Sequence, residues 1–168
     1  MNYLTFPLSK KHQRSGFCCG KNSLDHYFQK QVNQDIKRKL CACFVLVGES
    51  NRVKGFYTLS NGSIPREIVP ESIRKKMPGS YTGLPTTLLG RLAIDKDHAR
   101  QGLGEKLLID ALKRCYEASS KVGSMAVIVD PLDEEATSFY EKYGFIKLPD
   151  SGRMFLPMKT IQQLFASP

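Results

Sequence analysis

The sequence predicts a mixed α/β fold, in which a single domain holds a central mixed sheet flanked by helices. Apolar runs typical of strands alternate with apolar residues at helical spacing, in the order β-α-β-β-β-α-β-α-β-β. The chain has 168 residues, of which 41% are hydrophobic, and this length suits one core with little room for a second. Neither an internal repeat nor a linker is evident, so residues 1–168 are expected to form one domain.

The first part of the chain is expected to form a strand, a helix and a hairpin. A short strand is predicted over 3–8, and nearly continuous apolar sequence over 41–48 indicates a buried strand whose hairpin partner is 53–59. Asn22 or Ser23 is placed to cap the intervening helix. That helix is predicted by five apolar residues at near-helical spacing: Leu24, Tyr27, Phe28, Val32 and Ile36.

Four prolines break up the segment 63–85, which is expected to be an irregular insertion with one short helix around 71–76. A central strand over 86–94 and a turn over 95–101 then lead into a long helix from about 102 to 121.

The remaining elements alternate again between strand and helix. A strand is predicted over 125–129, and Asp133 is expected to cap a helix over 134–142 that Gly144 closes. Two final strands are expected over the ranges 145–148 and 154–158.

The charge of the chain favours an anionic partner. Lys and Arg number 25 against 16 Asp and Glu, a formal net charge of +9. Residues 1–106 hold 18 basic and 8 acidic residues, whereas residues 107–168 hold 7 and 8. This asymmetry indicates nucleic acid or a phosphorylated ligand, although many basic proteins bind neither.

Other features of the composition exclude several classes of protein. No apolar run is long enough to cross a membrane and no signal peptide is evident, so a cytoplasmic protein without membrane contact is expected. The five cysteines match neither a disulfide framework nor a metal-binding spacing. Buried free thiols and no metal are therefore expected.

A glycine-containing turn before the long helix is the most informative local feature. Gly102 and Gly104 let the backbone approach a ligand closely, and the first helical turn presents N–H groups to an anion such as pyrophosphate. A dinucleotide-binding fingerprint needs a small residue where Leu107 stands. A Walker loop needs Gly-Lys-Ser/Thr, whereas Glu105 and Lys106 follow the second glycine here.

Two motifs resemble those of the GNAT acyltransferase superfamily. Gly90-Arg91-Leu92-Ala93-Ile94-Asp95, followed by Gly102-Leu103-Gly104, looks like its acetyl-CoA-binding motif. The segment Ala136-x-x-Phe139-Tyr140-x-x-Tyr143-Gly144-Phe145 resembles the following helix and strand. The two motifs occur in the expected order and separation, and the predicted element order also agrees with that superfamily.

The resemblance extends over most of the chain to the TacT-like GNAT toxins of bacterial toxin–antitoxin pairs. It is carried by Phe17-Cys18-Cys19-Gly20, Leu24-Asp25-x-Tyr27-Phe28, Gly55-Phe56-Tyr57-Thr58-Leu59-Ser60 and Phe155-Leu156-Pro157-Met158, besides the first motif. Members of that family acetylate the α-amine of aminoacyl-tRNA and thereby stop translation. The sequence departs from the superfamily pattern at Ala99, where Gln or Arg is usual, and at Asp133, where Asn is frequent.

This resemblance implies an acetyl-CoA-dependent N-acetyltransferase that transfers acetyl to a primary amine. The pyrophosphate is expected on the backbone N–H groups of residues 101–105, near Arg100, and the pantetheine arm beside the strand of Leu92, Ala93 and Ile94. The change at Asp133 leaves open whether its side chain contacts the coenzyme. The expected coenzyme-binding residues are Leu92, Ala93, Ile94, Arg100, Gln101, Gly102, Leu103, Gly104, Glu105 and Asp133.

Tyr140 is the candidate catalytic residue. By resemblance it matches the tyrosine whose hydroxyl reaches the coenzyme sulfur, and a phenol with a pKa of about 10 is protonated at neutral pH. The alternative is a core aromatic beside Phe139 and Tyr143, and Tyr143 itself is expected to pack. No general base stands out; an α-amine has a pKa of about 8, so water suffices as base.

Basic residues are candidate contacts for the RNA. The clusters lie at the end of the first helix and in the insertion, where they are equally compatible with ordinary solvated faces. Arg91 differs because a charge within an apolar strand needs a partner, and the resemblance places it on the acceptor or coenzyme side. The expected substrate-binding residues are Arg91, Lys37, Arg38, Arg74, Lys75 and Lys76.

The sequence leaves three functions to be distinguished. The first is a toxin that acetylates aminoacyl-tRNA and is neutralised by a cognate antitoxin protein. The second is a GNAT enzyme that acetylates a small-molecule amine or a protein N-terminus, and the third is a binding module without catalysis. The asymmetric charge favours RNA as the acceptor. Whether the chain forms a homodimer is not determined by the sequence.

Overall fold

The computed structural model describes residues 2–149 and 151–166. The chain divides into two compact units, one formed by residues up to 60 with 89–112 and the other by residues 61–88 with those from 113 onward. Three elements contribute residues to both units: β3 (Val53–Pro65), β4 (Gly83–Ile94) and α4 (Leu103–Ser119). The described strands are hydrogen-bonded in the order β1-β2-β3-β4-β5-β7-β6.

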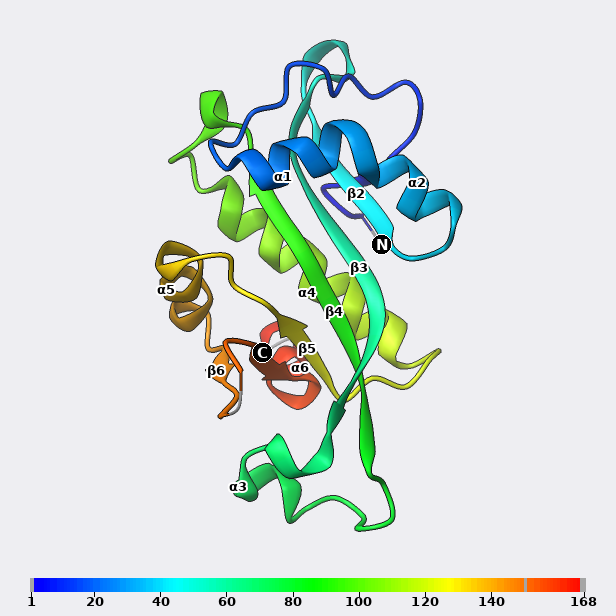
Figure 1. Cartoon of the computed structure of the whole chain (residues 1–168), viewed down its shortest axis with the longest axis vertical. Helices are drawn as coiled ribbons and strands as arrows, with labels where there is room; N and C mark the ends of the chain where they lie inside the picture. The colour runs from blue at the N-terminus through cyan, green and yellow to red at the C-terminus, as the bar shows by residue number, and fades with distance from the viewer. Residues whose placement is uncertain (1, 150, 167–168) are drawn as a thin grey trace. The chain divides into compact units, whose positions relative to one another are not determined.

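The first unit places helices on an antiparallel part of the sheet. β2 (Ala42–Val47) pairs with β1 (Phe6–Pro7) on one side and with β3 on the other, so that Val45 lies between Phe6 and Phe56. A continuous helical segment crosses the front of these strands, whereas the start of α4 lies behind them (Figure 1). That segment consists of α1 (Asn22–His26), the π-helix η1 (Tyr27–Gln31) and α2 (Val32–Lys37).

Aromatic stacking joins the helical segment to the sheet in this unit. The rings of Phe28 and Phe56 stack with centroids 4.1 Å apart, and Phe17 packs edge-on against them at 4.9 and 5.5 Å. All three side chains are buried, as are Val32 and Val45 beside them. The apolar face predicted for the first helix is therefore the face that covers the sheet.

A buried carboxylate ties the N-terminal segment to α4. Asp110 accepts hydrogen bonds from the Leu4 backbone N–H at 2.7 Å, the Thr5 hydroxyl at 2.6 Å and the Tyr57 hydroxyl at 2.8 Å. Its side chain is buried, and hydrogen bonds to a charged acceptor in such a place are stronger than those between neutral groups.

Replacing Asp110 by alanine is expected to lower the free energy of unfolding by about 2–4 kcal/mol, since several buried donors lose their acceptor at once. The exposed Asp130 offers a matched control, and its replacement by alanine should change stability by no more than about 0.5 kcal/mol. Urea unfolding monitored by circular dichroism measures both values. Equal stabilities for the two variants would contradict the role given to Asp110.

The second unit is built around the last strands. β7 (Met154–Pro157) lies between β5 (Ala126–Val129) and β6 (Ile146–Lys147) and is antiparallel to both. All four residues of β5 are buried. The core of this unit includes Ile64, Leu84, Ile128 and Phe155. Besides the end of α4, its described helical elements are η3 (Arg66–Ile68), α3 (Glu71–Arg74), α5 (Glu134–Lys142) and α6 (Met158–Phe165).

The strands around the insertion are longer than predicted. β3 continues to Pro65 and β4 begins at Gly83, so the range 63–85 is an irregular insertion only in its middle, where α3 lies as expected. The added residues of β3 are mostly exposed and polar, which removes the apolar signal on which the strand prediction relied.

Two further expectations at the chain ends are wrong. The first strand covers only Phe6–Pro7 rather than 3–8. The last strand ends at Pro157, and Met158 begins α6, a helix that the sequence analysis did not predict. Met158 and Ile161 are buried at three-residue spacing, which is helical periodicity in a stretch too short to stand out.

The predicted caps had mixed outcomes. Asp133 caps α5 as expected, because its carboxylate accepts a hydrogen bond from the Ala136 N–H at 2.9 Å. Neither Asn22 nor Ser23 caps α1: Lys21 occupies the N-cap position, and no side-chain hydrogen bond is formed there.

The five cysteines are free thiols; the burial expected of them is found for Cys43 and Cys115 but not for the other three, which are partly exposed. No helix in the described residues is long and apolar enough to cross a membrane.

Candidate coenzyme and substrate site

The loop between β4 and α4 presents backbone donors at a helix start. Arg100 and Gly102 have φ values of +61° and +74°, and α4 begins at Leu103. The first helical hydrogen bond runs from the Lys106 N–H to the Gly102 carbonyl at 3.3 Å, so the N–H groups between them precede the helical ladder. A Cβ added at Gly102 would meet nothing within 4 Å, so this residue adjoins open space. This geometry suits a pyrophosphate.

Asp95 fixes the start of this loop. Its buried carboxylate accepts hydrogen bonds from the Asp97 N–H at 2.9 Å and from the Cys18 N–H at 3.1 Å. The Lys96 N–H in turn donates to the Cys18 carbonyl at 2.8 Å, and Arg52 lies 3.9 Å from the carboxylate. The connection after β4 is thus anchored to the N-terminal segment through one side chain.

We expect replacement of Asp95 by alanine to weaken acetyl-CoA binding by about 10-fold, because the loop loses the two bonds that hold its first turn. Isothermal titration with acetyl-CoA measures the effect. The exposed Asp97 serves as the control, since its side chain bonds only to the exposed Arg52 among the described residues. Equal affinities for the Asp95 and Asp97 variants would contradict the anchoring role.

The end of β4 has one face in the core. Ala93 is buried in the first unit's core, while Leu92 and Ile94 are partly buried. Ile94 and the Ala93 carbonyl crowd against Gly55 on β3, where a Cβ would lie 2.6 Å from Ile94 Cδ1 and 3.0 Å from that carbonyl. Glycine at position 55 therefore lets the two strands approach closely at the level of the loop.

Arg91 lies on the same strand and does not pair with a carboxylate among the described residues. Its guanidinium carbon lies 3.5 Å from the centroid of the Tyr27 ring. This cation–π contact is what makes a charge acceptable within an otherwise apolar strand.

Tyr140 lies in the last turn of α5, in the second unit. Its ring packs against Phe139 at 5.3 Å and Phe145 at 5.2 Å, and only 7% of the residue is exposed. Burial raises the pKa of Tyr140 well above that of a free phenol. No residue in the described ranges accepts a hydrogen bond from its hydroxyl, and this oxygen is not among the buried unpartnered atoms of those residues, so the hydroxyl is open to a ligand. Tyr143 packs edge-on against Phe139 at 5.1 Å, as predicted.

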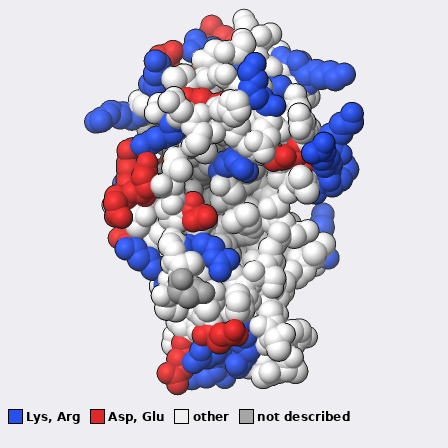
Figure 2. All heavy atoms as spheres, viewed as in Figure 1, with Lys and Arg blue, Asp and Glu red and all other residues white. Residues whose placement is uncertain are grey.

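The basic candidates differ in what they contact. Lys37 and Arg38 are exposed at the end of α2, where Lys and Arg gather at the right of Figure 2. Lys75 and Lys76 are exposed beside α3, where basic and acidic residues mix at the bottom of that view. Arg74 instead donates a hydrogen bond to the Glu67 carbonyl at 2.9 Å. That contact gives it a structural role in the insertion.

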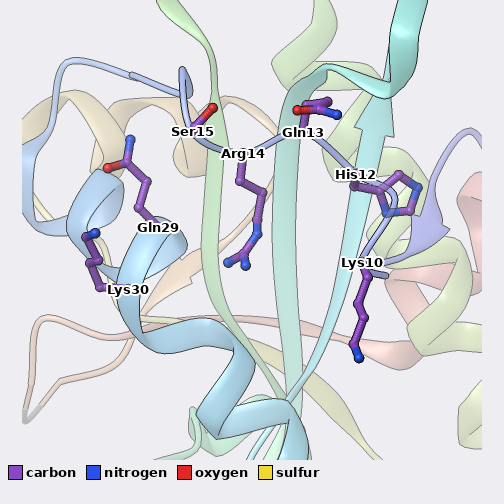
Figure 3. Close-up of a pocket in the computed structure, with 7 residues that line it drawn as sticks. All are labelled: Lys10, His12, Gln13, Arg14, Ser15, Gln29 and Lys30. Atoms are coloured by element: carbon purple, nitrogen blue, oxygen red, sulfur yellow. The ribbon is translucent and has the colours of Figure 1, made fainter.

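A polar hollow of about 360 Å³ lies between the N-terminal segment and the π-helix (Figure 3). His12 is buried there, its Nδ1 accepts a hydrogen bond from the Ser9 N–H at 3.0 Å, and burial lowers its pKa. The described residues that line the hollow include no carboxylate; they are Lys10, His12, Gln13, Arg14, Ser15, Gln29 and Lys30.

The predicted site residues fall in both units. The first holds Arg91, Leu92, Ala93, Ile94, Arg100, Gln101, Gly102, Leu103, Gly104, Glu105, Lys37 and Arg38. The second holds Asp133, Tyr140, Arg74, Lys75 and Lys76. Within the described part of the chain, no group of three or more His, Cys, Asp or Glu side chains is placed to hold a metal ion.

Residues 79–160 match the Acetyltransferase (GNAT) domain family. A tRNA-acetylating toxin of Mycobacterium tuberculosis (strain ATCC 25618 / H37Rv) is 36% identical over 151 residues, which cover 89% of each chain. The chain belongs to the GNAT acetyltransferases. The mixed α/β GNAT fold predicted from the sequence is thereby confirmed.

Two solved structures extend the similarity of this GNAT acetyltransferase. AtaT complexed with acetyl-methionyl-tRNAfMet is 30% identical with a TM-score of 0.89, over 98% of this chain and 100% of AtaT. A Tyr-to-Phe mutant of the AtaT toxin, bound to the C-terminus of the antitoxin AtaR and to acetyl-CoA, is 26% identical with a TM-score of 0.81. That match covers 97% of this chain and 98% of the other.

The sequence did not indicate that Asp95 anchors the loop after β4 or that Tyr27 stacks on Arg91. Asp95 was recognised only as the last residue of a motif, and Tyr27 only as part of an apolar helix face. A carboxylate directly after a buried strand was the available signal for Asp95, because such a group needs donors. No comparable signal marked Tyr27, whose cation–π partner Arg91 lies far from it in the sequence.

Proposed function

We propose that this protein is a toxin that uses acetyl-CoA to acetylate the α-amine of aminoacyl-tRNA and so blocks translation. Tyr140 carries the proposal: its ring is packed in the core, its phenol is protonated at neutral pH, and its hydroxyl has no acceptor among the described residues and is not one of the buried unpartnered atoms there, which suits a proton donor that meets a bound ligand. The similarity to a tRNA-acetylating toxin and to AtaT with an acetylated aminoacyl-tRNA supports the choice of substrate.

The residues after β4 would hold the coenzyme. The N–H groups of residues 101–105, with Arg100 nearby, bind the pyrophosphate at the positive end of α4. The backbone of Leu92, Ala93 and Ile94 pairs with the pantetheine arm, and one of its N–H groups stabilises the developing oxyanion. Asp133 already caps α5, so its carboxylate contributes to the site mainly by holding the helix that carries Tyr140.

Acetyl-CoA, when bound, supplies the thioester that the amine attacks and the thiol that leaves. Tyr140 donates the proton that the departing sulfur needs. Its raised pKa keeps this proton in place throughout the neutral range. The α-amine of an aminoacyl ester has a pKa of about 8 or below, so a water molecule is sufficient to take its proton.

The second substrate explains the charge of the chain. The basic residues that would contact RNA phosphates are Arg91, Lys37, Arg38, Lys75 and Lys76. Arg74 would add its positive charge while its hydrogen bond to the Glu67 carbonyl stabilises the insertion. We further propose that the protein works in the cytoplasm as one GNAT domain and that a cognate antitoxin binds it, as the C-terminus of AtaR binds AtaT.

An acceptor comparison tests this function. Release of coenzyme A is followed with purified protein, acetyl-CoA and one of three acceptors: a pool of aminoacyl-tRNAs, spermidine or a peptide with a free N-terminus. We expect release with charged tRNA only, with a rate at low substrate that falls steeply as salt rises. Faster release with spermidine or the peptide would establish the alternative of a small-amine or N-terminal acetyltransferase.

A further inference from the structure

Arg91 is a partly buried charge whose N–H groups have no protein acceptor among the described residues. Its neighbours Leu89 and Ala93 are buried in the first unit, and its guanidinium stacks on Tyr27 rather than meeting a carboxylate. Arginine stays charged in proteins and presents its five donors as a planar fork. Stacking leaves the edge of that fork free to bind an anion from outside the chain.

The hydroxyl group of Tyr27 is fixed by contacts with two side chains. Its hydroxyl donates a hydrogen bond to Asp35 Oδ2 at 2.8 Å and lies 3.4 Å from the Cys41 sulfur. Only 4% of Tyr27 is exposed. Burial, and then the bonds to Cys41 and Asp35, raise the pKa of Tyr27 far above its ordinary value, so the phenol stays neutral.

The backbone under Tyr27 is also fixed. Tyr27 opens the π-helix η1, a form that is rare and often found at functional sites. Arg14 donates to the Phe28 carbonyl at 2.7 Å, and Gln29 donates to the Phe17 carbonyl at 2.7 Å. Two side-chain bonds therefore clamp this turn against the N-terminal segment, and both donors are visible in Figure 3.

We propose that Tyr27 and Asp35 are positioning residues that hold Arg91 as the receptor for a phosphate group of the RNA substrate. The inference rests on the proposed function, from which the RNA comes. A planar fork matches the oxygens of a phosphate, and residues 1–106 carry the whole basic excess of the chain. Tyr27 supplies the surface on which the guanidinium lies, and Asp35 fixes the tilt of that surface.

The first test replaces Arg91 by glutamine and measures steady-state kinetics with aminoacyl-tRNA. We expect KM for the tRNA to rise by roughly 10- to 100-fold, with kcat and the KM for acetyl-CoA unchanged. The dependence of log KM on log salt should become shallower by about one unit. The exposed Lys121, replaced by glutamine, removes the same charge elsewhere and should change neither KM.

The second test separates positioning from folding. Tyr27→Phe keeps the stacked ring and the core but loses the bond to Asp35, and it should raise KM for the tRNA by about 3- to 10-fold. In an Arg91→Gln background the same change should add nothing, because the group it positions is gone. Asp35→Asn retains an acceptor for the phenol and should keep KM close to that of the wild type.

Each outcome bears on a different claim. A wild-type KM for Arg91→Gln overturns the phosphate site, as does a loss of antitoxin binding without any loss of tRNA binding. An equal effect of Tyr27→Phe in both backgrounds overturns the positioning role. If the wild-type protein acetylates no charged tRNA, the proposed function fails. The phosphate site is then tested by fluorescence anisotropy with uncharged tRNA, and equal Kd values for Arg91→Gln and the wild type would reject it.

Discussion

Replacement of Tyr140 by phenylalanine is expected to lower kcat by about 10²- to 10⁴-fold while leaving the affinity for acetyl-CoA unchanged. Phenylalanine keeps the contacts with Phe139 and Phe145 and removes only the hydroxyl, which has no acceptor among the residues that the structure describes. The loss therefore falls on the proton transfer to the departing sulfur and not on the fold. Single-turnover rates with saturating acetyl-CoA measure the effect directly.

Tyr143 offers a matched control for this experiment. It lies one residue beyond α5 and packs on Phe139, but it is partly exposed and was predicted to serve packing only. Tyr143→Phe should retain kcat to within about twofold. Wild-type turnover by Tyr140→Phe, or an equal loss in the Tyr143 variant, would remove Tyr140 from the mechanism.

The pH dependence of the wild-type enzyme follows from the same residue. Burial raises the pKa of Tyr140 above its ordinary value of 10.0, so the acid form persists at every pH below 10. We therefore expect that ionisation of Tyr140 causes no fall in kcat at any pH up to 10. A fall in kcat around pH 8 to 9 that disappears in Tyr140→Phe would contradict this assignment.

Replacement of Gly102 by valine is expected to weaken acetyl-CoA binding by roughly 10- to 100-fold. Gly102 has φ of +74°, a conformation that costs a β-branched residue about 1–2 kcal/mol or more. A shift of this backbone moves the N–H groups at the start of α4 away from the pyrophosphate. Isothermal titration with acetyl-CoA gives the affinity, and a melting curve confirms that the variant is folded.

Replacement of Gly102 by asparagine instead of valine provides the control. Asparagine adopts positive φ far more readily than valine, and a Cβ at position 102 meets nothing within 4 Å. Gly102→Asn should therefore bind acetyl-CoA within about threefold of the wild type. If asparagine and valine weaken binding equally, the loop does not act through its backbone conformation.

Local signals in the sequence identified most of the framework. The continuous apolar runs that became β2 and β5, and the amphipathic pattern that became the 17-residue helix α4, are visible in the sequence without knowledge of distant contacts. The glycines before α4 and the cap at Asp133 are short-range features whose chemistry is fixed by neighbouring residues.

The features that were missed depend on residues far apart in the chain. The outer part of β3 is mostly exposed and polar, and the outer part of β4 begins with a glycine and contains a proline, so neither has the apolar pattern of a strand. Asp95 acts through Cys18, and Tyr27 through Arg91, over separations that no local pattern encodes. The π-helix is a further case, since one irregular turn leaves the spacing of apolar residues almost unchanged.

The central claim is that the α-amine of an aminoacyl-tRNA receives the acetyl group. The most direct measurement incubates the protein with isotopically labelled acetyl-CoA and a pool of aminoacyl-tRNAs, hydrolyses the ester bond and analyses the released amino acids by mass spectrometry. We expect one or a few N-acetylated amino acids that carry the label, formed at least about 100-fold more slowly by Tyr140→Phe. The account would be contradicted if the released amino acids carried no label while the enzyme transferred acetyl from acetyl-CoA to another amine.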